Sequence, residues 1–215
     1  MKKVGSRTKE LQGIVSEKLK EIGGGSLFAV DLRPHCNAAL GDPAVTGTPN
    51  DLRQLPVGKQ TFRGVTFDII DQKRNNGNSY LRLLSTKHAG SFPRQITGIK
   101  AGGKKASKLF FLHAMEWGDE HPSPAKAGEY RIHYQGQAAP AVVPIENGKT
   151  VIDWWAAKMP SDAPVAWFAD NGNALVCVYV YPWTNPHPDW PIETIDFVSD
   201  DVGPVLSLIA VTGEE

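Results

Sequence analysis

Tryptophan is the residue type that most strongly suggests a binding surface in this sequence. Six tryptophans occur in 215 residues, which is high for a globular chain. Sugars present C–H-rich faces that stack on flat indole rings, provided that those rings stay open to water. We predict that four of the six indoles form stacking platforms, namely those of Trp117, Trp155, Trp183 and Trp190.

Polar side chains lie close to these tryptophans in the chain. Sugar hydroxyls can hydrogen-bond to carboxylate, amide and imidazole groups. The polar partners that we predict are Asp119, His121, Asn185, His187 and Asp189. The alternative for any single tryptophan is that it fills one end of a hydrophobic core. Together, these residue types predict a carbohydrate-binding surface without a catalytic group.

No catalytic motif is present to compete with this interpretation. The sequence contains no GxSxG elbow, no HExxH pair, no P-loop and no paired-cysteine metal motif. A glycosidase needs two carboxylates at one sugar bond. The acids expected at loops or strand ends are Glu116, Asp119, Glu120, Asp153 and Asp189. The alternative function is therefore a small hydrolase or lyase that uses His121 or His187 with one of these acids.

Metal binding is open from the sequence, and no metal ligand is assigned. We expect His113 and His133 to be hydrogen-bonded residues within strands rather than metal ligands. Oxygen-bearing side chains are frequent in the loops, and Ca²⁺ takes six to eight oxygen ligands. The residues considered for a structural Ca²⁺ are Asn37, Asp42, Asn50, Asp51, Asp196 and Asp200. None of them has the spacing of an EF-hand.

The charge balance argues against nucleic-acid and membrane partners. Lys plus Arg equals Asp plus Glu at 23 each, so the chain lacks the basic excess of a general nucleic-acid binder. A basic cluster at Lys100, Lys104, Lys105 and Lys108 is interpreted as a solvated turn, because glycines interrupt it and no aromatic residue interleaves. No run of about 18 apolar residues indicates a membrane span.

The N-terminal residues and the cysteines bear on the compartment. The start, MKKVGSRTKELQGIV, is positively charged but lacks the apolar middle of a signal peptide. We expect either a cytoplasmic protein or a module from a longer secreted protein, and we favour the second. Cys36 and Cys177 are predicted to be free thiols, with one disulfide as the alternative.

One helix is predicted before the part of the chain that is rich in strands. Leu11, Ile14, Val15, Leu19 and Ile22 recur at the spacing of one helix face, and Gly23-Gly24-Gly25 follows. Residues 1–25 are therefore predicted to be an amphipathic helix with a glycine-rich linker. Residues 26–215 are predicted to form one β-sandwich domain that binds carbohydrate.

Short runs of β-branched and aromatic residues predict eleven strands in this domain. They span residues 27–32, 61–70, 80–84, 96–99, 109–114, 129–134, 141–145, 165–168, 174–181, 192–198 and 205–211. A short helix is predicted at 152–158, and the segments 33–60 and 182–191 are expected to be long loops. Many strands without intervening long helices predict an all-β, two-sheet antiparallel sandwich. The run LVCVYVY is apolar at every position and predicts a strand that is covered on both faces.

Several segments together resemble one group of modules. These are DLRQLPVGKQTFRGVTFDIID (51–71), NNG (75–77), FFLHAMEW (110–117), DWW (153–155) and NPHPDWPIETIDFVS (185–199). In this order they resemble the galactose-binding-domain-like β-sandwich modules of bacterial glycoside hydrolases and other polysaccharide-degrading enzymes. The similarity covers residues 30–211, and its motifs are more characteristic of the fold than of a ligand.

The resemblance implies a jelly-roll sandwich, often with a structural calcium, that holds a catalytic partner domain on its polysaccharide. Modules of this group bind either in loops at one end of the sandwich or on a concave sheet face. Their ligand-contacting loops vary, so the resemblance assigns no individual residue. Such modules normally accompany a catalytic domain and a signal peptide, which this sequence does not show. A further alternative is a structural accessory domain that packs on a catalytic neighbour.

Overall fold

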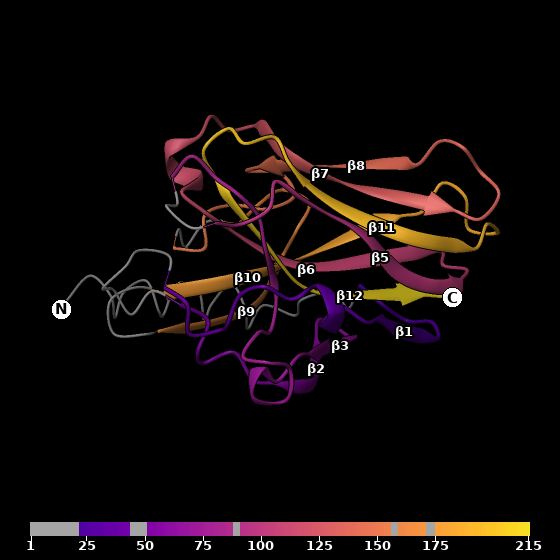
Figure 1. Ribbon diagram of the computed structural model, residues 1–215, viewed down its shortest axis with the longest axis horizontal. Coiled ribbons are helices and arrows are strands. Elements are labelled where there is room, and N and C mark those ends of the chain that lie inside the picture. The colour runs from indigo at the N-terminus through magenta and orange to yellow at the C-terminus, as the bar shows by residue number, and fades with distance from the viewer. Residues whose placement is uncertain (1–21, 44–50, 88–90, 156–158, 171–174) are drawn as a thin grey trace.

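Antiparallel strands make up almost all the regular structure of the protein. The computed structural model describes residues 22–43, 51–87, 91–155, 159–170 and 175–215 (Figure 1). The helical elements within these ranges are the 3-10 turns η1 (Arg33–His35), η2 (Gln72–Arg74) and η3 (Gly118–Glu120). The prediction of an all-β antiparallel fold is confirmed. No helix among the described residues is long and apolar enough to cross a membrane.

Within the described ranges, twelve strands form three sheets. They are β1 (Leu27–Val30), β2 (Gly58–Phe62), β3 (Val65–Ile69), β4 (Leu81–Arg82), β5 (Gln95–Lys104), β6 (Lys108–Glu116), β7 (Ala125–Tyr134), β8 (Ala141–Asn147), β9 (Val165–Asp170), β10 (Leu175–Thr184), β11 (Ile192–Ser199) and β12 (Val205–Glu214). The six-stranded sheet has the order β1-β12-β6-β10-β9, with β4 also paired to β12. The four-stranded sheet has the order β5-β11-β7-β8, and β2 and β3 form a separate hairpin.

The two larger sheets face each other across one hydrophobic core. Stacked aromatic rings connect them: Phe111 of β6 lies 4.1 Å from Tyr130 of β7, and Tyr130 lies 5.2 Å from Phe197 of β11, between ring centroids. Such ring pairs add to the stabilisation that burial of their apolar surface supplies. Figure 1 shows the four-stranded sheet on one side of the six-stranded sheet and the β2–β3 hairpin on the other.

A second hydrophobic cluster covers the outer face of the six-stranded sheet. Phe110 and Leu112 of β6 point toward it, with Phe67 of the hairpin and Trp154 packed among them. Strand β10 therefore has two apolar faces: Val176, Val178 and Val180 belong to this outer cluster, whereas Cys177 and Tyr179 belong to the inner core. The prediction that LVCVYVY is covered on both faces is confirmed.

The predicted strands match the observed ones with one exception. The segment 61–70 was predicted as one strand, but it is part of the β2–β3 hairpin. Arg63 and Gly64 make the two-residue turn, with φ of 56° and 78°. Two successive positive φ angles are typical of the hairpin turns whose twist matches the strands. The turn lacks the usual Asn-Gly or Asp-Gly sequence, so the pattern did not reveal it.

The remaining predictions about elements have mixed outcomes. The predicted N-terminal helix lies outside the described residues except for Ile22, which is not helical, and Gly23-Gly24-Gly25, predicted as a linker, are not helical either. The predicted helix at 152–158 is wrong for 152–155, which are extended or form a turn. The basic cluster is not a turn alone, since Lys100 and Lys104 lie within β5 and Lys108 begins β6 of the other sheet. Cys36 and Cys177 are both free, as predicted.

Candidate functional site

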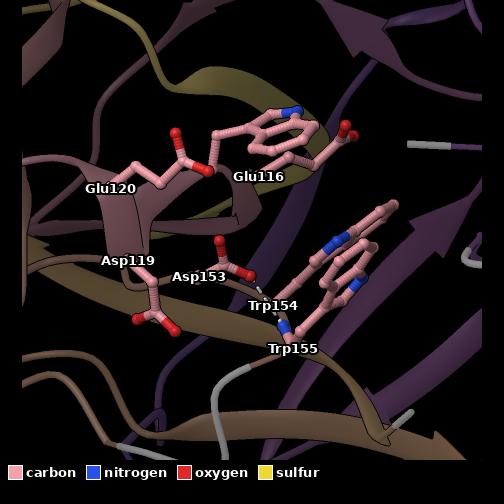
Figure 2. A pocket seen from close by; sticks show the side chains of 7 residues that line it. Glu116, Asp119, Glu120, Asp153, Trp154 and Trp155 are labelled. Atoms are coloured by element: carbon pink, nitrogen blue, oxygen red, sulfur yellow. Dashed lines mark hydrogen bonds between the residues drawn. The ribbon is translucent and has the colours of Figure 1, made fainter. Parts of the chain in front are cut away.

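A pocket of about 130 Å³ opens where β6 ends. The residues that line it are Glu116, Trp117, Asp119, Glu120, Asp153, Trp154 and Trp155. In the view of Figure 2, the carboxylates of Asp119, Glu120 and Asp153 lie on one side and the indoles of Trp154 and Trp155 on the other. Three indoles and four carboxyl groups thus surround one small space.

The chain turns sharply at the first of these tryptophans. Glu116 is the last residue of β6, and Trp117 follows with a left-handed φ of 62° before η3 begins. A bulky residue in this region carries backbone strain of about 1–3 kcal/mol, and such strain often marks functional sites. Gly118 comes next, where a Cβ would lie 2.6 Å from the Met115 side chain and 3.0 Å from the Asp153 nitrogen. Only glycine allows this close approach.

The Asp153–Trp155 segment lies between two strands that have separated. Pairing of β6 with β10 ends at His113 and Tyr179. Beyond that point the Trp154 nitrogen donates to the Met115 carbonyl at 2.8 Å, and the Cys177 nitrogen donates to the Trp154 carbonyl at 2.9 Å. The inserted segment satisfies backbone groups that the separated strands would otherwise leave unpaired. It also places two indoles beside the end of β6.

The Asp153 side chain connects the two walls of the pocket. One of its oxygens accepts a hydrogen bond from the Gly118 nitrogen at 2.8 Å, and the other accepts one from the Trp155 nitrogen at 2.9 Å. Burial raises the pKa of Asp153, while these amide hydrogen bonds oppose the rise. The Asn147 amide further holds the turn by donating to the Gly118 carbonyl at 2.8 Å. Asp153 is therefore a structural element of the site as well as part of its lining.

Glu116 forms a buried ion pair with Arg82 of β4. The Arg82 guanidinium donates to Glu116 Oε1 at 2.7 Å, and both side chains are 1% exposed. Burial raises the pKa of Glu116 to about 7, although Arg82 opposes this shift. Burial alone would lower the pKa of Arg82, but Tyr80 and Glu116 hold it above its ordinary value, so the guanidinium stays charged.

Three buried polar atoms of the lining have no hydrogen-bond partner among the described residues. They are Glu116 Oε2, Trp154 Nε1 and Trp155 Nε1. Buried polar atoms are nearly always hydrogen-bonded, and each unpaired one costs about 1–3 kcal/mol. The set contains one acceptor and two donors. A hydroxyl group can donate to the first and accept from the other two, which makes a polyhydroxylated ligand chemically suitable.

A lysine at the rim contacts both kinds of lining residue. The Lys87 ammonium lies 2.6 Å from Glu120 Oε2 and 5.9 Å from the centroid of the Trp117 ring. The Lys87 and Glu120 side chains are 43% and 50% exposed, so this ion pair contributes little to stability. The geometry nevertheless shows that a cation fits between an indole face and a carboxylate of this site.

The structure brings three of the predicted site residues together here: Trp117, Asp119 and Trp155. His121 lies directly after η3, where its carbonyl accepts from the Asn147 amide at 3.1 Å. Its Nε2 has no partner in the described part of the chain, yet the residue does not line the pocket.

The other predicted site residues lie at the opposite end of the six-stranded sheet. Trp183 and Thr184 pair with Leu109 and Lys108 at the start of β6, whereas the pocket lies at its end. Eight residue steps of about 3.3 Å separate the two ends by about 26 Å. One sugar unit or a disaccharide therefore cannot contact both groups. The sequence-predicted set divides into two distinct surfaces.

Trp183 is part of strand β10 rather than of a loop. Its side chain is half-buried and packs against the core between the sheets. The loop that follows contains a stacked pair, in which the His187 and Trp190 rings lie 3.9 Å apart with an interplanar angle of 8°. Tyr134 contacts both rings edge-on. Trp190 remains 37% exposed, but His187 covers one of its faces, and Asp189 is exposed beside it.

Asn185 supports this loop from inside. Its Oδ1 accepts from the Tyr134 hydroxyl at 2.6 Å and from the His187 nitrogen at 3.0 Å. Its Nδ2 donates to the Ala106 carbonyl at 2.8 Å and the His187 carbonyl at 3.1 Å. With the side chain buried and these four bonds made, we assign Asn185 to the loop's architecture rather than to a ligand.

Replacement of Asn185 should therefore affect stability. Asn185→Ala leaves the Tyr134 hydroxyl and the Ala106 carbonyl without their partner, and we expect a loss of about 1–3 kcal/mol in unfolding free energy. Urea denaturation of the two proteins measures this difference. The exposed Asp189→Asn substitution in the same loop is the control and should change stability by less than about 0.5 kcal/mol. Equal stability of Asn185→Ala and the parent protein would contradict the assignment.

Four residues of the pocket were not predicted as binding residues. Glu116, Glu120 and Asp153 were considered only as candidate acids, and Trp154 only as part of the DWW segment. Local sequence contained a signal for each, since all four lie within three residues of a predicted tryptophan. Their convergence depends on the insertion of 153–155 between β6 and β10.

The histidines in strands have structural roles, as expected. His113 Nε2 lies 2.8 Å from the Thr150 carbonyl, so it must donate, and Nδ1 accepts from the Tyr130 hydroxyl at 3.0 Å. Burial lowers the pKa of His113 to about 4, and the ring stays neutral. His133 Nε2 lies 2.8 Å from Asp196 Oδ2 in the other sheet. Among the described residues, no cluster of three or more His, Cys, Asp or Glu side chains could hold a metal ion.

Comparisons of this chain with protein-family models, curated proteins and solved structures find no match. The function therefore has to be inferred from the chemistry of the pocket itself.

Proposed function

We propose that this protein is a non-catalytic carbohydrate-binding module whose site is the pocket at the end of β6. One observation carries the proposal. Indole rings and unpaired hydrogen-bonding atoms line the same small space, with Trp117 and Trp155 among the rings and Glu116 Oε2 among the atoms. Sugars offer the matching chemistry, because their C–H faces stack on indoles while their hydroxyls both donate and accept hydrogen bonds.

The position of the pocket supports this proposal. It lies at the end of β6, where the six-stranded sheet provides a rigid scaffold for turns and loops that can vary in sequence. The jelly-roll, galactose-binding-like topology remains a proposal too, and a site at one end of the sandwich is consistent with it. In this proposal the module attaches a catalytic domain of a longer, extracellular protein to its polysaccharide. We propose no cofactor beyond a structural Ca²⁺, for which no ligands are assigned.

Binding should depend on the pocket and not on the opposite loop. We expect Trp117→Ala to abolish retention on an insoluble polysaccharide that retains the parent protein, because the variant removes one stacking wall. Shallow sugar sites bind in the micromolar to millimolar range, about −4 to −8 kcal/mol. Because this binding is weak, the loss of one stacking platform is enough to make retention undetectable. Affinity electrophoresis or a pull-down on a polysaccharide panel measures retention.

Trp190→Ala is the matched control, since it removes an exposed indole in the loop after β10, which leaves the sheet at the opposite end of β6 from the pocket. It should leave retention intact. The opposite pattern, with retention lost in Trp190→Ala and kept in Trp117→Ala, would move the site to the His187–Trp190 loop. Melting temperatures of both variants show whether each change acts on binding or on folding.

A second candidate function is glycoside hydrolysis, and one observation favours it. Glu116 and Asp153 line the same pocket, and burial raises the pKa of Glu116 to about 7, as is typical of a general acid. Against it, one oxygen of Glu116 is held by the Arg82 guanidinium at 2.7 Å, and backbone amides occupy both oxygens of Asp153. Release of reducing sugar by the isolated chain, lost in Glu116→Gln, would favour hydrolysis over binding alone.

A further inference from the structure

The lining of the pocket is strongly one-sided in charge. Of the described residues that form it, four are acidic and none is basic. Two basic side chains reach these acids from outside the lining: Arg82 pairs with Glu116 inside the protein, and Lys87 pairs with Glu120 at the rim. A neutral sugar would not require such an excess of carboxylates. An anionic sugar would be repelled by it.

Lys87 already shows how a cation fits at this site. Its ammonium bonds to Glu120 at 2.6 Å and lies over the Trp117 ring at 5.9 Å. An ammonium within about 6 Å of an indole centroid is attracted by the ring, and sets of aromatic rings with carboxylates bind amines in this way. Because the Lys87 side chain is 43% exposed, a ligand ammonium can displace it.

The floor of the pocket supplies an acceptor that no described residue satisfies. Glu116 Oε2 is buried, lines the pocket and has no partner among them. An ammonium group carries three N–H donors and no acceptor. A single cationic amine could therefore donate to this oxygen while its charge lies near the remaining carboxylates. That charge opposes the burial that raises the pKa of Glu116 to about 7, and so favours the ionised carboxylate.

We propose that the pocket binds the cationic amine of an amino-sugar glycan, with the sugar face on an indole and the ammonium among the carboxylates. The inference rests on the proposed function and specifies its ligand class. An amino sugar combines the C–H face that Trp117 and Trp155 can stack on with the positive charge that the acids attract. A free amine lacks the first feature, and a neutral sugar lacks the second.

Three β-1,4-linked tetrasaccharides separate these contributions: a glucosamine tetramer, its N-acetylated counterpart and cellotetraose. At about pH 6 the free amines are protonated, whereas the acetamides and hydroxyls are neutral. Isothermal titration of the full chain should show that the glucosamine tetramer binds at least about tenfold more tightly than either of the other two tetrasaccharides. The preference should decrease as salt is added, because rim charges are screened.

Variants of the rim should change affinity for the glucosamine tetramer in opposite directions. Glu120→Gln removes a carboxylate that Lys87 shows to be accessible to cations, and we expect about threefold weaker binding. Lys87→Met removes the competing internal cation and should strengthen binding by a similar factor. Asp189→Asn makes the same charge change as Glu120→Gln, but at the other end of the sheet, and should leave affinity unchanged.

The outcomes distinguish this inference from the proposed function. Equal affinity for all three tetrasaccharides, with binding still abolished by Trp117→Ala, would contradict amine recognition but leave the proposed carbohydrate site standing. If the protein binds none of the three tetrasaccharides and no member of a polysaccharide panel, both amine recognition and the proposed carbohydrate-binding function are wrong. A glucosamine preference that Asp189→Asn weakens and Glu120→Gln does not would place the amine outside this pocket.

Discussion

Replacement of Glu116 by leucine should remove about 3–5 kcal/mol from the free energy of unfolding at neutral pH. The substitution leaves the Arg82 guanidinium 1% exposed and without its counter-ion. Arginine does not lose its proton in proteins, so the charge stays buried and uncompensated. Contacts of Arg82 with the Tyr80 and Phe92 rings, each at 5.5 Å, offset only part of this cost. Urea denaturation at pH 7 measures the loss.

The reverse variant is the control. In Arg82→Met, Glu116 can become neutral, because its pKa is already raised to about 7 and would rise further without the guanidinium. At about pH 6, Arg82→Met should therefore lose less unfolding free energy than Glu116→Leu. The double variant Arg82→Met/Glu116→Leu should recover much of the loss, since buried ion pairs are often replaceable by apolar residues of similar size. If Glu116→Leu is as stable as the parent protein, Glu116 and Arg82 do not form the buried pair.

The parent protein should also show the titration of Glu116 directly. Its folded-state pKa of about 7 lies above the ordinary value of 4.5, so this carboxyl favours folding below about pH 4.5, and that contribution is lost as the pH rises through 7. The shift corresponds to roughly 3 kcal/mol. Glu116→Leu lacks this dependence, so the stability gap between the two proteins should be wider at pH 5 than at pH 8.

Gly128→Ala should destabilise the protein by about 3 kcal/mol or more. A Cβ at this position of β7 would overlap the Val198 carbonyl oxygen and lie 2.5 Å from the Leu206 side chain. The first obstacle is backbone of the neighbouring strand β11, which cannot move without breaking the β7–β11 ladder. Overpacking in a core typically costs about 1–3 kcal/mol, and rigid backbone neighbours bring the cost to the upper end. Thermal unfolding measures the effect.

Gly41→Ala is the matched control for this steric argument. Among the described residues, no atom lies within 4 Å of a Cβ built at Gly41, and its backbone conformation suits any residue. We expect a change within about 0.5 kcal/mol. If Gly128→Ala and Gly41→Ala have the same melting temperature, strands β7 and β11 are not packed as described.

Most of the strands could be predicted from sequence because strand formation has a local signal. Alternating or continuous apolar runs of β-branched and aromatic residues marked β6, β7, β10, β11 and β12. The hairpin turn at Arg63–Gly64 was not predicted because Arg-Gly is not a typical turn sequence, although both residues adopt a positive φ.

The candidate site was only partly predictable. Sequence proximity correctly grouped Trp117 with Asp119, but it also suggested one surface that included Trp183 and Trp190. Those residues lie at the far end of β6, and Trp183 packs on the core. Trp155, 38 positions after Trp117, joins it because residues 153–155 insert between β6 and β10. No local pattern encodes such an insertion.

The residue types alone determined an all-β chain that is rich in tryptophans and acids, since strand periodicity and side-chain chemistry are properties of short segments. The tertiary structure decided which of those side chains share a pocket. It paired Arg82 with Glu116 across two strands, and it placed Glu116 Oε2 beside the indoles without a hydrogen-bond partner from any residue that the structure describes. Long-range register and the separation of strands at a sheet end set these contacts, and both depend on how the whole core packs.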